Sequence, residues 1–156
     1  MDTQFFDSSA IVKNYLNETG TAWIKSLITA IPSNEIYVSR LASVEVVSVI
    51  VRRVRSGLIT TTDGQNYLNR FKSDLSLHFK VVEISLPLVS TAVNLVEKHG
   101  LRGYDAIQLA SGLTLSLRLS AAMSTPFSFT FISADNNLNN AAQSESLAVD
   151  NPNNHP

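Results

Sequence analysis

The chain lacks cysteine, is poor in histidine and has no long apolar run. Without cysteine it forms no disulfide and offers no thiolate nucleophile or cysteine ligand for zinc. Its three histidines, His78, His99 and His155, are far apart in the sequence, which argues against a histidine-rich zinc site. No stretch approaches the roughly 18 apolar residues that span a bilayer, and the N-terminus lacks the basic start of a signal peptide. We therefore expect a cytoplasmic protein that does not insert into a membrane.

The chain also lacks a strong net charge. Twelve Lys and Arg residues against 13 Asp and Glu residues give a formal charge of −1, so the overall charge does not indicate nucleic-acid binding. The 156 residues, 44% of them hydrophobic, are typical of one globular domain. We expect that domain at residues 1–150. Residues 151–156 are polar and contain two prolines, which predicts a flexible C-terminal tail.

Segments with the apolar spacing of strands alternate with segments that have the spacing of helices. Strands are expected at 4–6, 35–38, 80–85, 127–133 and 147–149, and helices at 8–16, 22–30, 40–55, 61–78, 87–98 and 104–117. A further short helix is expected after Asp135, and residues 120–126 are expected to form a loop. This alternation predicts an α/β fold, a three-layer α/β/α sandwich with a central parallel sheet. In such sheets, ligands bind beyond the carboxyl ends of the strands.

Four acidic residues differ from the others in their local context. Asp7 and Asp135 follow expected strands, Asp105 opens an apolar helix, and Glu45 lies among apolar residues of another helix. Each aspartate has a simpler explanation as a helix cap or as a partner of the helix dipole. Glu45 is harder to explain, because a carboxylate that faces a core needs a cation. The simpler alternatives for Glu45 are a position at the rim of the core or an ion pair with Arg40, Arg52 or Arg53.

Taken together, the four carboxylates indicate a metal site. Clustered carboxylates repel one another and raise one another's pKa, and a divalent cation reverses that penalty. Mg²⁺ and Mn²⁺ prefer hard oxygen ligands. Such ions activate water, orient a phosphodiester and stabilise the leaving oxygen. An acidic cluster without histidine or cysteine therefore predicts Mg²⁺ (or Mn²⁺) as the cofactor.

Four segments, 5–13, 39–45, 100–110 and 131–136, carry these acids in a set order. In that order they resemble the PIN-domain family, and within it the VapC-type toxin ribonucleases of type II toxin–antitoxin systems. The resemblance spans about residues 4–150. It implies a PIN-like fold, Mg²⁺- or Mn²⁺-dependent endoribonuclease activity on an RNA substrate, a homodimer and a small cognate antitoxin. The acidic quartet of the family corresponds to Asp7, Glu45, Asp105 and Asp135, as catalytic and metal-binding residues.

The resemblance also suggests supporting residues. The hydroxyl that often follows the first aspartate corresponds to Ser8 or Ser9, and Ser133 precedes the last acid, although a serine at a strand end is more often structural. Basic side chains commonly contact phosphates, and the candidates here are Lys13, Arg40 and Arg102. The alternative for such residues is an ordinary solvated helix surface.

Two other classes of function remain open at this stage. One is a PIN-like module that binds RNA or a protein partner without cutting. The other is phosphoryl transfer of the haloacid-dehalogenase or receiver kind, which also begins with an aspartate after the first strand. Haloacid dehalogenases have a second aspartate two residues after the first one, and this chain has Ser9 at that position. The leading hypothesis is therefore the metal-dependent endoribonuclease.

Overall fold

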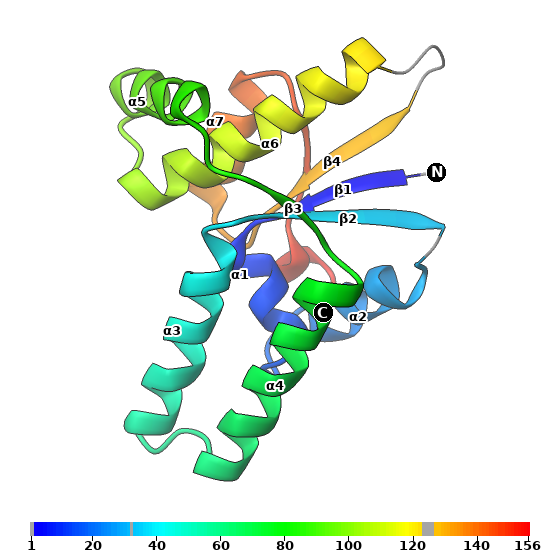
Figure 1. The fold of residues 1–156 in the computed structure, drawn as a ribbon, viewed down its shortest axis with the longest axis vertical. Helices are drawn as coiled ribbons and strands as arrows, with labels where there is room; N and C mark the ends of the chain where they lie inside the picture. Colours follow the sequence, from blue (N-terminus) through cyan, green and yellow to red (C-terminus); the bar gives the residue numbers. More distant parts are fainter. Residues whose placement is uncertain (1, 32, 123–126) are drawn as a thin grey trace.

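The computed structural model describes residues 2–31, 33–122 and 127–156. In this part of the chain five parallel strands form one sheet in the order β3-β2-β1-β4-β5. The strands are β1 (Asp2–Phe6), β2 (Asn34–Ser39), β3 (Lys80–Val82), β4 (Ser128–Ile132) and β5 (Ala148–Asp150). Helices cover both faces of the sheet (Figure 1). The three-layer α/β/α sandwich with a central parallel sheet is thus confirmed.

The two helical layers come from different parts of the chain. One face is covered by α1 (Ser8–Ile11), the 3₁₀ turn η1 (Val12–Asn14), α2 (Thr21–Thr29), α3 (Ala42–Arg55) and α4 (Thr61–Leu77). The other is covered by α5 (Leu86–His99), α6 (Gly103–Ala122) and α7 (Asn136–Ser144). Figure 1 shows α3 and α4 as an antiparallel pair below the sheet, and α5 to α7 above it. In the described part of the chain, no helix combines the length and apolar character needed to cross a membrane.

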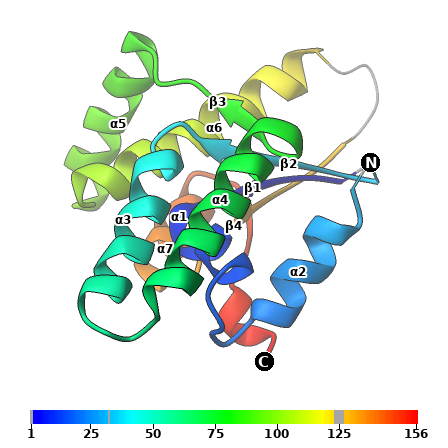
Figure 2. The ribbon, with the colours of Figure 1, turned by 60° about the horizontal axis from the view of Figure 1, so that its bottom comes forward.

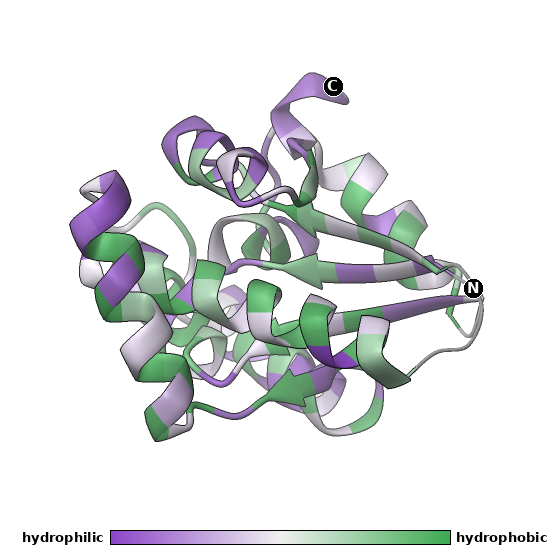
Figure 3. Ribbon diagram, turned by 90° about the horizontal axis from the view of Figure 1, so that it is seen from above, coloured by the Kyte–Doolittle hydropathy of each residue, from purple (hydrophilic) through white to green (hydrophobic). Residues whose placement is uncertain are grey.

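The central strand β1 shows why both faces must be covered. Successive side chains of a strand point to opposite faces. Phe5 stacks on Phe131 of β4, with ring centroids 5.4 Å apart, in the core beneath α5 to α7. Its neighbour Phe6 lies in the opposite core with Ile132. Figure 3 shows hydrophobic residues in the strands, and hydrophobic and hydrophilic stretches alternating along the helices. A parallel sheet of this kind is stable only between two covering layers.

Helix α6 extends further than the sequence predicted. It continues to Ala122, so residues 120–122 are helical rather than part of the predicted loop; residues 123–126 lie outside the described residues. Leu115 is fully buried and Leu119 packs against the same core, which stabilises the late turns of the helix. Gly112 permits this close packing, because a Cβ there would lie 2.7 Å from the Phe131 ring.

The last six residues, predicted as a flexible tail, have regular structure in part. They form a short 3₁₀ turn, η2 (Pro152–Asn154), beside α2 (Figure 2). The His155 ring stacks on Trp23, with ring centroids 4.1 Å apart. Gly20 has φ +85°, and a Cβ there would lie 2.2 Å from the Pro152 carbonyl oxygen. Trp23 and Gly20, both far from the last six residues in sequence, thus give this polar segment a packing surface and the space it needs.

Candidate active site

A cleft of about 520 Å³ opens at the carboxyl ends of β1 and β4. We call it the acidic cleft, because its lining includes all four acids predicted from the sequence: Asp7, Glu45, Asp105 and Asp135. Asp7 lies between β1 and α1, Glu45 on α3, Asp105 on α6, and Asp135 just before α7. This is the edge of a parallel sheet where ligands collect. The fold therefore brings together residues that come from four distant parts of the chain.

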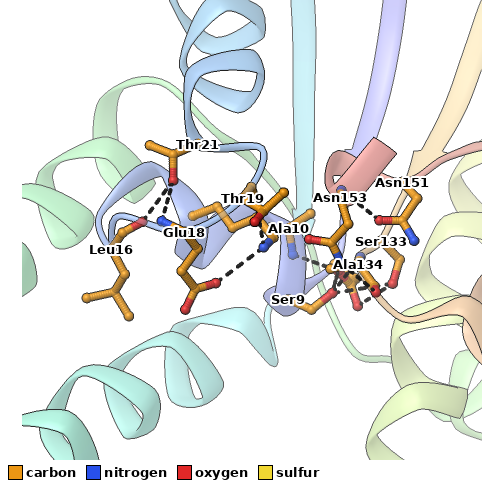
Figure 4. A network of polar contacts seen from close by, with 12 residues as sticks. Ser9, Ala10, Leu16, Glu18, Thr19, Thr21, Ser133, Ala134, Asn151 and Asn153 are labelled. Carbon is orange, nitrogen blue, oxygen red and sulfur yellow. Dashed lines mark hydrogen bonds and ion pairs between the residues drawn. The ribbon is translucent and has the colours of Figure 1, made fainter. Parts of the chain in front are cut away.

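Asp7 lies at the base of the acidic cleft and is nearly sealed from solvent, with 4% of its surface exposed. Its Oδ1 accepts hydrogen bonds from the Ser9 hydroxyl (2.7 Å) and the Ala10 N–H (3.0 Å), and its Oδ2 accepts one from the Ser133 hydroxyl (3.0 Å). Figure 4 shows Ser9, Ser133 and Ala134 gathered at this point. Burial raises the pKa of Asp7 to about 7; the hydrogen bonds oppose that rise, and the charge of Glu45 adds to it.

Glu45 is held by two other side chains. Its Oε2 accepts hydrogen bonds from the Ser8 hydroxyl (2.5 Å) and from Gln108 Nε2 (2.6 Å). Gln108 is 2% exposed, and its Nε2 also lies 2.7 Å from the Ser8 oxygen. The Gln108 Oε1 is buried and has no hydrogen-bond partner in the described structure. The amide group of Gln108 is thus committed to orienting Ser8 and Glu45.

The sequence-based reason for choosing Glu45 was partly wrong. The buried side of α3 consists of Ala42, Val46 and Ile50, so Glu45 faces the acidic cleft and not the apolar core. The neighbouring Val44 is 66% exposed although it is apolar. Of the arginines offered as partners, Arg40 pairs with Glu83 and Arg53 with Glu18. Arg52 lines the acidic cleft, and its Nε donates a hydrogen bond to the Ser48 carbonyl.

Asp105 and Asp135 form the more open side of the acidic cleft, and both are partly buried. Asp135 Oδ1 accepts hydrogen bonds from the N–H groups of Asn137 (2.7 Å) and Leu138 (3.1 Å), so this residue does cap α7. Burial raises the pKa of Asp105, and the negative charges of Asp135 and Glu45 raise it further, whereas Arg102 lowers it. Asp135 therefore caps α7 and lines the acidic cleft at the same time.

The three predicted supporting serines, Ser8, Ser9 and Ser133, all contact an acid of the cleft. Of the three predicted basic residues, Arg102 lines the cleft. Lys13 does not: it is buried, and its Nζ donates to the Thr19 carbonyl (2.9 Å) and to Glu18 (3.3 Å). Arg40 is on the surface in an ion pair with Glu83 and does not line the cleft.

Gln108 was not among the candidate residues predicted from the sequence. It follows Asp105 by three positions, and residues three apart on a helix share a face. The signal that the sequence offered was a glutamine in an otherwise apolar segment of the helix.

The donor set of the acidic cleft fits Mg²⁺ or Mn²⁺, which prefer carboxylate oxygens. Among the residues that the structure describes, no three acidic or histidine side chains converge closely enough to form a complete metal site. Mg²⁺ does not require such a cage, because it keeps several waters and commonly takes one or two carboxylates from the protein. The negative charges of Asp135 and Glu45 both raise the pKa of Asp105, as expected for three carboxylates that line one cleft.

Fold and site together define an α/β/α domain with a carboxylate-lined cleft at the carboxyl ends of its parallel strands. The sequence profile of the PIN domain matches residues 5–143. The chain therefore belongs to the PIN-domain family.

Known proteins similar to this chain include VapC ribonucleases. It is 30% identical to Ribonuclease VapC45 of Mycobacterium tuberculosis over 115 residues, which cover 74% of this chain and 78% of that protein. The crystal structure of M. tuberculosis VapC20, described as a sarcin–ricin loop cleaving toxin, superposes with a TM-score of 0.61 at 15% identity, covering 88% of this chain and 94% of VapC20. A chain of a toxin–antitoxin complex from Klebsiella pneumoniae gives 0.53 at 17% identity, covering 85% and 86%. The chain is thus a distant homologue of the VapC ribonucleases and shares their fold.

Proposed function

We propose that this protein is a metal-dependent endoribonuclease that hydrolyses RNA phosphodiester bonds, and that it acts in the cytoplasm as the toxin of a toxin–antitoxin pair. The observation that carries the proposal is the convergence of Asp7, Glu45, Asp105 and Asp135 on one cleft. Membership of the PIN-domain family and homology to VapC ribonucleases support it.

In this proposal the four carboxylates would hold Mg²⁺ or Mn²⁺, and the bound ion would supply activation of water and stabilisation of the leaving oxygen. Ser9 and Ser133 orient the carboxylate of Asp7 through the hydrogen bonds described above. Gln108 and Ser8 do the same for Glu45. Arg102 is exposed beside the acids, where its guanidinium would bind a phosphate oxygen of the RNA.

The proposed protein partners are a second copy of the chain and a small cognate antitoxin. A toxin–antitoxin complex among the structural neighbours supports the antitoxin. An exposed apolar stripe on α5 supports a protein contact; its residues are Leu86, Val89, Val93 and Val96. Contiguous exposed apolar surface of this kind commonly marks an interface.

The test is cleavage of RNA in the presence of Mg²⁺ or Mn²⁺ by wild type, Asp7→Asn, Asp105→Asn and the control Asp2→Asn. Asp2 is exposed at the start of β1, far from the acidic cleft. We expect the two cleft variants to lose at least about 100-fold in rate, while Asp2→Asn keeps wild-type activity. Full activity in both cleft variants would refute the proposal.

A second candidate is a PIN-like module that binds RNA or a protein without cutting. It is favoured by the absence, among the described residues, of three converging metal ligands. Calorimetric titration with Mg²⁺ and Mn²⁺ separates the two candidates when it is combined with the cleavage assay. RNA binding without metal-dependent cleavage would support the binding module.

A further inference from the structure

A second cleft of about 420 Å³ adjoins the acidic cleft. One wall is formed by His99 at the end of α5 and by residues 100–102, which connect α5 to α6. The other wall is formed by residues of α7: Asn137, Asn140, Ala141 and Ser144. We call it the α7 cleft. Arg102, Asp105 and Asp135 line both clefts, so the two are continuous. A linear polymer bound at the four acids would extend directly into the α7 cleft.

The α7 cleft carries polar groups that the acidic site does not use. Asn137 and Asn140 are exposed, three positions apart on α7, and so lie on one face of the helix. In the described structure only their backbone groups form hydrogen bonds, with Asp135 and Ser144. Each side-chain amide therefore has two donors and a carbonyl acceptor available. That pairing of donor and acceptor is what the edge of a nucleobase requires.

The rest of the α7 cleft offers apolar surface, a histidine ring and a positive charge. Leu101 and Ala141 provide apolar surface in its lining. The His99 ring is held in place, with its Nε2 2.6 Å from the Glu145 carboxylate. Arg102 stands where the two clefts join and supplies a positive charge there. The volume is within the roughly 300–1,000 Å³ of small-molecule pockets.

We propose that the α7 cleft binds one unpaired nucleotide of the RNA substrate, next to the phosphodiester at the acidic cleft. Asn137 and Asn140 contact the base edge, and Arg102 binds the phosphate that joins this nucleotide to its neighbour. Proteins read RNA sequence mainly through the exposed edges of unpaired bases, so these two asparagines determine the sequence preference near the cut. The inference rests on the proposed function, because it concerns the substrate of the same site.

The first test measures binding without cleavage. Wild type, the double variant Asn137→Ala/Asn140→Ala and the control Asn94→Ala are titrated, in EDTA, with a fluorescent single-stranded RNA of about 12 nucleotides and random sequence. Asn94 is an exposed asparagine of α5 that does not line the α7 cleft. We expect the double variant to bind about tenfold more weakly and the control to bind as wild type. Equal thermal unfolding of the three proteins excludes a folding defect.

The second test sequences the RNA ends produced from the same random pool with Mn²⁺. Wild type and Asn94→Ala should show the same base preference at one position beside the cut, and the double variant should lose it. If wild type cuts no RNA but the double variant still binds RNA tenfold more weakly, the proposed function fails while the nucleotide site stands. Unchanged RNA affinity together with an unchanged base preference would overturn the nucleotide site.

Discussion

The two sides of the acidic cleft are built differently. On one side, Asp7 and Glu45 accept five hydrogen bonds from serine, glutamine and backbone donors, and Asp7 is almost fully buried. On the other, Asp105 and Asp135 are partly exposed, and the pKa of Asp105 is raised by the neighbouring charges of Asp135 and Glu45. The first side is oriented mainly by side chains from distant elements, whereas on the second side Asp135 is held by the N–H groups of the helix that it caps. The second keeps a negative charge density that a cation or its waters can neutralise.

The largest effect that separates the two sides should come from Gln108, which orients Glu45. Gln108→Leu keeps the volume of this buried side chain but removes both hydrogen bonds of its amide. We expect the affinity for Mn²⁺ to fall by about 10- to 100-fold, as with other residues that orient metal ligands, with RNA cleavage falling in parallel. Calorimetric titration measures the affinity. The control is Gln143→Leu, at an exposed position on α7; equal Mn²⁺ affinity in the two variants would show that Glu45 keeps its orientation without the amide.

The buried side should also dominate the pH dependence of stability. In the metal-free protein the pKa of Asp7 is raised from 3.8 to about 7. The folded state therefore binds this proton more tightly than the unfolded state, so the free energy of unfolding falls as pH rises from about 4 to about 7 and then levels off. Asp7→Asn should remove this decline and raise the free energy of unfolding above about pH 8 by about 2 kcal/mol. Urea unfolding in EDTA across this range measures it, and an unchanged slope in Asp7→Asn would contradict the assignment.

A smaller effect should distinguish the two roles of Asp135, as a helix cap and as an acid of the cleft. Asparagine caps helices as well as aspartate does, so Asp135→Asn should leave the free energy of unfolding nearly unchanged, while Asp135→Ala should lower it by about 1 kcal/mol. Both variants should bind Mn²⁺ more weakly, because both remove the charge. If Asp135→Asn kept wild-type affinity for Mn²⁺, Asp135 would be only a cap.

The smallest effect on stability is expected at Asp105. Asp105→Asn removes a carboxylate whose charged form is disfavoured by burial and by two neighbouring acids. Because Asp105 is partly exposed, we expect the metal-free protein to gain only a few tenths of a kcal/mol at neutral pH. The same urea measurements in EDTA test this. Loss of stability in Asp105→Asn would mean that its carboxylate makes a favourable contact in the folded protein.

The two acids on the open side of the cleft, Asp105 and Asp135, were the easier ones to predict from the sequence. Asp135 follows a strongly apolar strand, and Asp105 opens a clear helix, so local patterns were sufficient. The oriented side was harder. Glu45 was chosen on the premise that it faced a core, but the buried positions of α3 are Ala42, Val46 and Ile50, one position after Glu45 and its equivalents on neighbouring turns. A helix rich in valine has no unique apolar face until its neighbours are in place.

The contacts of the basic residues were also not predictable from the sequence alone. Lys13 is close to Asp7 in sequence and was predicted to contact RNA, yet its ammonium group is directed to Glu18 and Thr19. Arg102, predicted on the same grounds, does line the cleft. The difference arises because α1 turns into the 3₁₀ segment η1, which buries Lys13. Sequence distance alone does not reveal that turn.

The sequence by itself determined the alternation of strands and helices, the parallel sandwich and the order of the four acids, because these depend on apolar periodicity and on residues at strand ends. The tertiary structure alone decided which side chains meet those acids. Gln108 reaches Glu45 across 63 positions of sequence, and Ser133 reaches Asp7 across 126. Such contacts depend on the packing of separate elements against one sheet, and no local pattern specifies them. The same packing placed Asn137 and Asn140 beside the acidic cleft, where the sequence showed only a polar helix.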